Sequence, residues 1–140
     1  MITLREYNTE DLVEIDDAVE PFLPKMPMKE FTELTQRGIA ITGVEDGDVR
    51  ACGGIAYFND NDGVAWLRLS KKCLHHSLQW SRAIRETFKV MRESVGDLVV
   101  STYILKNFCR GQRVARLIGM KKTDESEEFQ GNTYIKYTVF

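Results

Sequence analysis

The sequence is poor in the residues that build metal sites and disulfide frameworks. Its 140 residues include three cysteines, Cys52, Cys73 and Cys109, and two histidines, the neighbours His75 and His76. No Cys-x-x-Cys pair or Cys/His ligand spacing occurs, so no zinc site is predicted. Adjacent residues of a helix point about 100° apart, which is poor geometry for two histidines to ligate one metal. We expect reduced, structural thiols and no metal.

Long apolar runs are also absent. No stretch approaches the roughly 18 uncharged apolar residues of a membrane span, and the beginning of the chain lacks the apolar core of an export signal. Hydrophobic residues make up 43% of the chain and charged residues 29%, which is typical of a folded domain and too apolar for a disordered chain. We therefore predict a single domain over residues 1–140, located in the cytoplasm.

The charges are unevenly distributed although the net charge is only −2. Residues 1–67 carry 5 basic and 14 acidic side chains, residues 68–122 carry 13 and 3, and residues 123–140 carry 1 and 4. The basic middle predicts an anionic ligand, or else basic and acidic faces that meet in the fold. Nucleic acid is not an expected partner, because no zinc-finger or RNA-recognition signature accompanies these charges.

Apolar spacing predicts seven strands and four helices in the order β-α-α-β-β-β-α-β-α-β-β. In the longest helix, Trp80, Ile84, Phe88 and Met91 form one apolar stripe. The expected fold class is α+β, an α/β layer sandwich whose mixed, mostly antiparallel sheet is flanked by helices. The strands are predicted at 2–7, 39–44, 49–58, 64–69, 97–105, 120–128 and 132–140, and the helices at 12–19, 29–36, 74–93 and 110–118.

Four short segments carry a resemblance to a known family. They are Ala51-Cys-Gly-Gly54, Trp66-Leu-Arg-Leu-Ser70, Asn107 and Leu117-Ile-Gly119. With the element order, they make the chain resemble the GNAT-type N-acyltransferase fold over nearly its whole length, and most closely the small tailed-phage proteins of that fold, which include a small internal virion protein. The resemblance implies a phage-encoded N-acyltransferase that moves an acyl group from acyl-CoA (acetyl-CoA) to an amine, in the host cytoplasm or the virion.

The resemblance also implies where the cofactor lies. In that family the sheet opens after the strand that corresponds to 64–69, and the pantetheine pairs with the backbone at the end of that strand. The pyrophosphate lies at the start of the next helix, where free N–H groups favour anions and where Lys71 and Lys72 stand here. The cofactor-binding residues expected on this basis are Leu67, Arg68, Leu69, Ser70, Lys71, Lys72, His76, Ser77, Asn107 and Arg110.

The phosphate loop departs from the pattern of the family. That pattern is Gln/Arg-x-x-Gly-x-Gly/Ala, and Leu74, Ser77 and Gln79 stand at its three defining positions. No glycine occurs between Gly63 and Gly96, although glycine is what lets a backbone approach a phosphate closely. The loop is therefore degenerate.

The catalytic groups depart from the pattern as well. Ala115 or Val114 stands where the family has the tyrosine that protonates the leaving thiolate, and the strand at 64–69 contains no carboxylate to act as a base. The catalytic residues are left unassigned, with candidates His75, His76, Cys109 and Tyr137, and with Tyr103 and Tyr134 as other possible donors. The alternative function is a catalytically inactive protein of this fold, either a structural or ejected virion protein or a binder of host protein.

Overall fold

The computed structural model describes residues 1–139. Their strands form one eight-stranded mixed sheet. The strands run in the order β1-β3-β4-β5-β6-β8-β7, and β2 pairs separately with β5. Within the described chain the neighbouring strands are antiparallel, except that β5 and β6 run parallel. The strands are β1 (Ile2–Glu6), β2 (Ala18–Val19), β3 (Gly38–Glu45), β4 (Asp48–Tyr57), β5 (Asp62–Ser70), β6 (Val99–Leu105), β7 (Lys121–Phe129) and β8 (Asn132–Val139).

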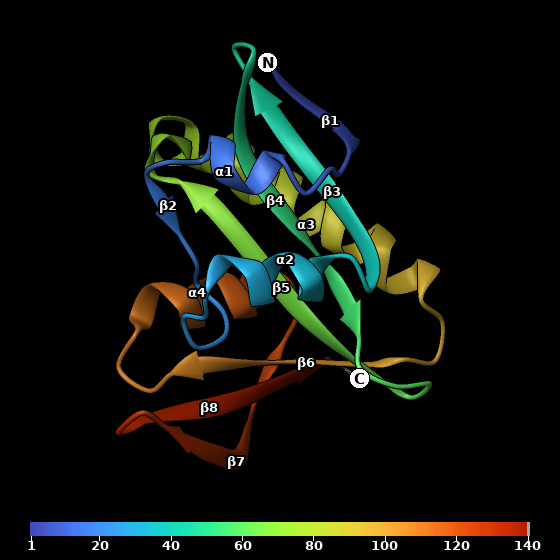
Figure 1. Cartoon of the computed structure of the whole chain (residues 1–140), viewed down its shortest axis with the longest axis vertical. Coiled ribbons are helices and arrows are strands. Elements are labelled where there is room, and N and C mark those ends of the chain that lie inside the picture. Colours follow the sequence, from blue (N-terminus) through green and yellow to red (C-terminus); the bar gives the residue numbers. More distant parts are fainter. Residues whose placement is uncertain (140) are drawn as a thin grey trace.

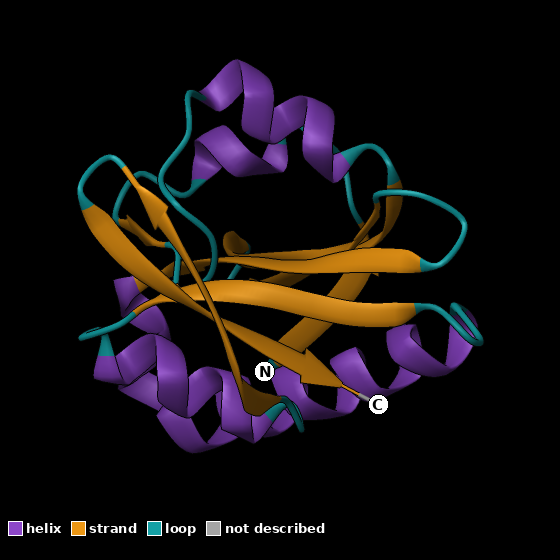
Figure 2. Cartoon of the chain, turned by 90° about the horizontal axis from the view of Figure 1, so that it is seen from below, coloured by secondary structure: helices purple, strands orange, loops and turns teal. Residues whose placement is uncertain are grey.

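Helices cover both faces of this sheet. Helices α1 and α2 lie over one face and α3 and α4 over the other, as Figures 1 and 2 show. The expected fold class and element order are therefore confirmed, with β2 as an unexpected addition. None of the helices in the described part of the chain is long and apolar enough to cross a membrane. The helices are α1 (Asp11–Glu14), α2 (Met28–Thr35), the 3-10 helix η1 (Lys71–His76), α3 (Ser77–Ser94) and α4 (Cys109–Leu117).

The apolar stripe of α3 packs against the sheet as its spacing predicts. Trp80, Phe88 and Met91 are buried, and Ile84 is half-buried beside them. The main core cluster joins Phe88 and Met91 to side chains of β4, β5, β6, α4 and β8. Because residues spaced by three or four lie on one side of a helix, a single stripe joins α3 to several strands. The expected strand at 132–140 is observed over Asn132–Val139, and Phe140 lies outside the described residues.

The helix expected at 12–19 is wrong beyond its first turn. Helix α1 ends at Glu14, and Val19 lies in β2. The guanidinium group of Arg68 on β5 donates hydrogen bonds to the carbonyl oxygens of Leu12 at 3.0 Å and Ile15 at 3.0 Å. These carbonyls would otherwise accept bonds from the next helical turn, so a long-range contact ends the helix where the apolar spacing would continue it.

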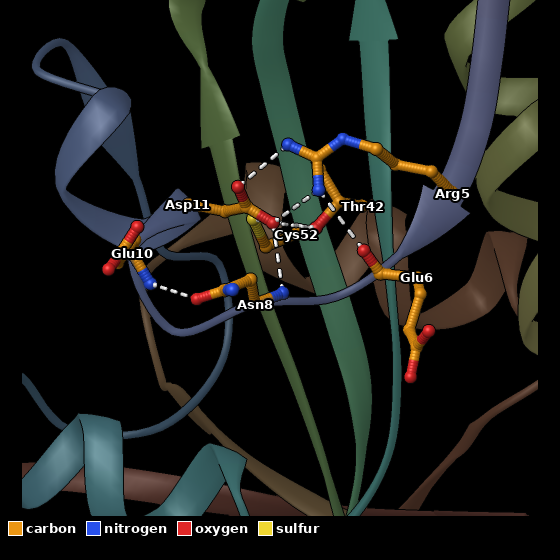
Figure 3. A network of polar contacts seen from close by, with 7 residues as sticks. All are labelled: Arg5, Glu6, Asn8, Glu10, Asp11, Thr42 and Cys52. Atoms are coloured by element: carbon orange, nitrogen blue, oxygen red, sulfur yellow. Dashed lines mark hydrogen bonds and ion pairs between the residues drawn. The ribbon is translucent and has the colours of Figure 1, made fainter.

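The buried carboxylate of Asp11 fixes α1 to the sheet (Figure 3). Arg5 of β1 binds both of its oxygens, at 2.7 and 2.9 Å, and the hydroxyl of Thr42 of β3 donates at 2.7 Å. The backbone N–H of Asn8 donates at 3.0 Å. Burial opposes ionisation of this carboxyl, but the bonds from Arg5, Thr42 and Asn8 outweigh it, so the pKa of Asp11 is lowered. The position of α1 on the sheet, and so of the start of the segment that follows it, is therefore fixed by these bonds.

Candidate active site at the opening between β5 and β6

The sheet opens between its two parallel strands. Strand β5 pairs with β6 over three residues, from Asp62 opposite Val99 to Val64 opposite Ser101. Just beyond this point the hydroxyl of Thr102 on β6 donates to the carbonyl oxygen of Ala65 on β5 at 3.0 Å. The remaining residues of the two strands diverge, and in Figure 1 their arrowheads end well apart at the left. The divergence of the two strands that is expected after the strand at 64–69 is therefore present, and it is called the opening below.

The free edge of β5 beyond this point is covered by another part of the same chain. Strand β2 pairs antiparallel with β5, with Ala18 opposite Ser70 and Val19 opposite Leu69. Figure 1 shows β2 beside the arrowhead of β5. Leu69 and Ser70 are among the residues whose backbone the resemblance assigns to the pantetheine. In this structure the chain itself uses that edge.

Side chains of β5 hold this covering segment in place. Besides its two bonds to the carbonyl oxygens of Leu12 and Ile15, Arg68 forms an ion pair with Glu20, directly after β2. The hydroxyl of Ser70 donates to the carboxylate of Asp17 at 3.0 Å and accepts from the backbone N–H of Lys72 at 3.1 Å. The bond from Ser70 lowers the pKa of Asp17, and the charge of Lys72 adds to this effect. The carboxylate of Asp17 is thus held in its charged form, and Glu20 is paired with a basic side chain.

The chain then passes between β6 and α4. The backbone N–H of Leu23 donates to the carbonyl oxygen of Tyr103 on β6 at 2.7 Å. A β-carbon on Gly111 of α4 would lie 2.5 Å from the carbonyl oxygen of Pro21, so this helix position accepts no side chain unless the backbone shifts. Phe22 is buried in the main core cluster. A cavity of about 50 Å³, lined in part by Phe22, Trp66 and Leu67, lies next to β5.

The basic residues expected to bind phosphate are accessible. Lys71, Lys72 and Ser77 are exposed at the end of β5, in η1 and at the start of α3. Asn107 and Arg110 are exposed in the turn after β6 and in the first turn of α4. The two groups follow the ends of the two diverging strands. The structure therefore places basic side chains on both sides of the opening.

His76 makes a contact at the far end of β3. Its Nδ1 lies 2.9 Å from an oxygen of Glu45, and Trp80 Nε1 donates to the other oxygen at 3.3 Å. Glu45 is buried, which opposes its ionisation, but its bonds from Trp80 and His76 and the charge of Arg50 lower its pKa overall. The side chain of His76 is 52% exposed, so its second ring nitrogen can reach solvent. Neighbouring His75 is exposed in η1.

The remaining catalytic candidates differ in accessibility. Cys109 is exposed at the first residue of α4, after the end of β6. Tyr137 of β8 is 1% exposed and belongs to the main core cluster. Ala115 is fully buried in the same cluster and Val114 packs against it, so neither position faces an open site. Of these residues, Cys109 combines a titratable group with access to the end of β6.

Three residues of this site were missed by sequence analysis: Asp17, Val19 and Glu20. The run Asp16-Asp17-Ala18-Val19-Glu20 has no alternation long enough to predict a strand. Two-residue strands depend on their partner, and here the partner lies about fifty residues further along the chain. A signal was available in the prolines at 21, 24 and 27, which disfavour helix after this point.

Comparison with known proteins identifies the fold. No protein-family model matches the chain, and no curated protein matches its sequence. Ard1 from Thermoplasma volcanium has a TM-score of 0.74 at 9% identity, covering 99% of this chain and 96% of that protein. The ribosomal-protein-S18-alanine N-acetyltransferase from Escherichia coli has a TM-score of 0.71 at 12% identity, covering 99% and 93%. An acetyltransferase of the GNAT family from Streptococcus pneumoniae has a TM-score of 0.69 at 10% identity, covering 99% and 98%. At these identities the likeness shows the fold, which is that of the GNAT acetyltransferases.

Proposed function

We propose that the chain is an acyl-CoA-dependent N-acyltransferase that works slowly, with acetyl-CoA as the acyl donor and an amine as the acceptor. The observation that carries this proposal is the opening between β5 and β6, in a fold shared along 99% of the chain with N-acetyltransferases. Fold alone does not fix function, and the proposal therefore rests on this opening and on the basic groups beside it.

The proposed reaction is direct attack of a neutral amine on the thioester carbonyl. The nitrogen forms a bond to the carbonyl carbon, the C–S bond breaks, the amine loses a proton and the thiolate gains one. Lys71 and Lys72 would bind the phosphates, and the backbone of Leu67–Ser70 would align the pantetheine. Cys109 is our candidate for the group that protonates the thiolate. Without the usual tyrosine we expect a rate about 10²–10⁴-fold below that of an enzyme with a well-placed acid.

Charge reversal at the two lysines tests the cofactor site. We expect Lys71→Glu with Lys72→Glu to weaken acetyl-CoA binding by more than tenfold in calorimetry, and more so at low salt, because exposed charges act through a screened field. The matched control is Lys121→Glu with Lys122→Glu, two exposed lysines at the start of β7. Equal affinity in the two double variants would place the cofactor elsewhere.

A second candidate function is favoured by one observation, the occupation of the β5 edge by β2. In this alternative the chain is a catalytically inactive protein of the GNAT fold, phage-encoded, that serves in the virion or binds host protein. Acetyl-CoA left intact after long incubation with varied amines, together with no binding in calorimetry, would support it. Measurable binding with slow transfer or slow hydrolysis would support the acyltransferase.

A further inference from the structure

We infer that residues 17–20, called the strap below, form a removable cover over the edge of β5, and that the structure shows the closed state of the site. The inference rests on the proposed function, because it assigns the uncovered edge to the acyl donor. In the closed state the strap uses the backbone of Leu69 and Ser70, and Arg68 and Ser70 bind its two carboxylates. A ligand that lies along β5 must displace it.

The strap is separable from the core because the residues that flank it are buried, whereas the strap itself is half-buried. It is held by two ladder pairs, two polar side-chain contacts and the packing of Ala18. Ile15 before it and Phe22 after it are 1% and 3% exposed. Residues 17–20 are each half-buried, and the strap adds two residue pairs to the sheet. Lifting it breaks those pairs and contacts, while the buried flanking residues stay in place. Segments with few buried apolar contacts open at low free energy.

The backbone next to the strap is strained. Leu23 has a φ of 69°, in the left-handed region that residues with side chains rarely adopt. Its N–H bond to Tyr103 holds it there. Strained conformations persist when surrounding contacts over-determine them, and they occur at segments that switch. A second arrangement of residues 17–20 could relieve this strain without changing the core.

The contacts of the strap indicate what replaces it. The strap offers an extended chain of amide groups with a carboxylate at each end, Asp17 near Lys72 and Glu20 on Arg68. Arg68 keeps its bonds to the carbonyl oxygens of Leu12 and Ile15, so its guanidinium group stays in position when Glu20 leaves. The uncovered edge therefore suits an extended ligand that has amide groups and negative charge. The pantetheine and phosphates of acyl-CoA have this chemistry.

The closed state also leaves a polar group of β5 without a partner. Trp66 is 2% exposed, and among the described residues no atom accepts a hydrogen bond from its Nε1. Side chains two apart on a strand project to the same face, so Trp66 lies on the face that carries Arg68 and Ser70. Buried donors without an acceptor are uncommon in folded proteins. Tyr7 and Phe31 pack edge-on against the ring of Trp66, at centroid distances of 5.4 and 5.6 Å, so this donor belongs to the core under α1 and α2 and stays there when the strap lifts.

Weakening the strap should strengthen ligand binding, because a closed state lowers apparent affinity by the fraction of molecules that are open. We expect Glu20→Ala, which removes the ion pair with Arg68, to bind acetyl-CoA about five- to tenfold more tightly than the parent in calorimetry. The matched control is Glu33→Ala, which removes the same charge from an exposed position of α2. Equal affinities of Glu20→Ala and the control would overturn the inference.

Locking the strap gives the opposite test in one protein. Ala18 and Ser70 are opposite each other in the ladder, so Ala18→Cys with Ser70→Cys can form a disulfide across it. The background is Cys109→Ser, because Cys109 is exposed and could mispair. We expect the oxidised protein to bind acetyl-CoA at least tenfold more weakly than the same protein after reduction. The same affinity in both redox states would show that the strap does not cover the site.

Hydrogen exchange separates failure of the inference from failure of the proposed function. If the strap opens by itself, the amides of residues 17–20 exchange far faster than those in the middle of β4, and faster still in Glu20→Ala. Exchange of the strap only with global unfolding would overturn the inference. A different outcome is fast exchange of the strap amides without acetyl-CoA binding, either in Glu20→Ala or in the reduced double-cysteine protein. This result would refute acyl-CoA as the ligand, and the inference would be wrong for that ligand although the strap opens.

Discussion

Asp11 joins three elements through one carboxylate, and this makes its charge a condition of stability. Its oxygens bind Arg5 of β1, the hydroxyl of Thr42 of β3 and the N–H of Asn8. The pKa of Asp11 is lower in the folded protein than in the unfolded chain. The contribution of this charge to the free energy of unfolding is therefore complete above the unfolded pKa of about 3.9. It is lost as the pH falls through the pKa of the folded protein.

Replacing Asp11 by asparagine tests this role. We expect Asp11→Asn to lower the free energy of unfolding by about 2–3 kcal/mol at pH 7, because it removes the charge partner of Arg5 and places an amide donor against other donors. The difference from the parent should shrink in urea titrations at pH 3, below the unfolded pKa, because the unfolded parent then takes up a proton at this carboxyl and the folded parent loses part of its advantage. The control is Glu14→Gln on the exposed side of α1. A difference that does not depend on pH would mean that packing, not charge, is what Asp11 contributes.

Helix α3 is held to the sheet by its apolar stripe, and Phe88 is the test of that packing. Phe88 is 5% exposed, and we expect Phe88→Ala to cost on the order of 3–5 kcal/mol in denaturant unfolding, since it removes a buried ring and leaves a cavity. Val90, two positions away, is 61% exposed, so Val90→Ala should change stability by less than about 0.5 kcal/mol. Equal midpoints for the two variants would show that Phe88 is not inside.

Helix α4 packs closely against the chain that follows the strap, at Pro21. An exposed helical glycine usually gains up to about 1 kcal/mol on replacement by alanine. At Gly111 the added carbon would lie 2.5 Å from the Pro21 carbonyl oxygen and 2.9 Å from the ring of Phe108, so we expect Gly111→Ala to destabilise by about 1–3 kcal/mol. Arg113→Ala on the exposed side of the helix serves as the control. Thermal unfolding measures both, and a stabilised Gly111→Ala would show that Pro21 does not press on α4.

The uneven charge of the sequence corresponds to contacts between its acidic and basic segments and to exposed basic side chains. The acidic first half supplies Glu20, which pairs with Arg68 of the basic middle, and Asp17, which lies near the charge of Lys72. Other basic groups of the middle, among them Lys71 and Arg110, stay exposed near the opening. Acidic and basic segments therefore meet in the fold, as one of the two sequence-based explanations expects; the anionic ligand of the other explanation stays a prediction, for which exposed basic groups are present.

The fold was largely predictable from the sequence, because most of its elements are long enough to show a period. The stripe of α3 and the turns around Gly47 and Gly131 mark their elements by local chemistry. The strap was not predictable, because Ala18 and Val19 form a strand only through a partner about fifty residues away. The end of α1 depends on Arg68 for the same reason. Local patterns report local structure, and the covered edge of β5 is a long-range property.

The measurement that tests the account most directly is an NMR titration of the parent protein with acetyl-CoA, following the backbone amides of β2 and β5. We predict that the amide chemical shifts of Ala18, Val19, Leu69 and Ser70 change together and saturate at one affinity. The amides of the strap should lose their protection from hydrogen exchange. Those of Leu69 and Ser70 should keep it, because the ligand takes the place of β2 on the edge of β5. Saturable binding that leaves these four amides unchanged, or no binding at millimolar ligand, would contradict the account.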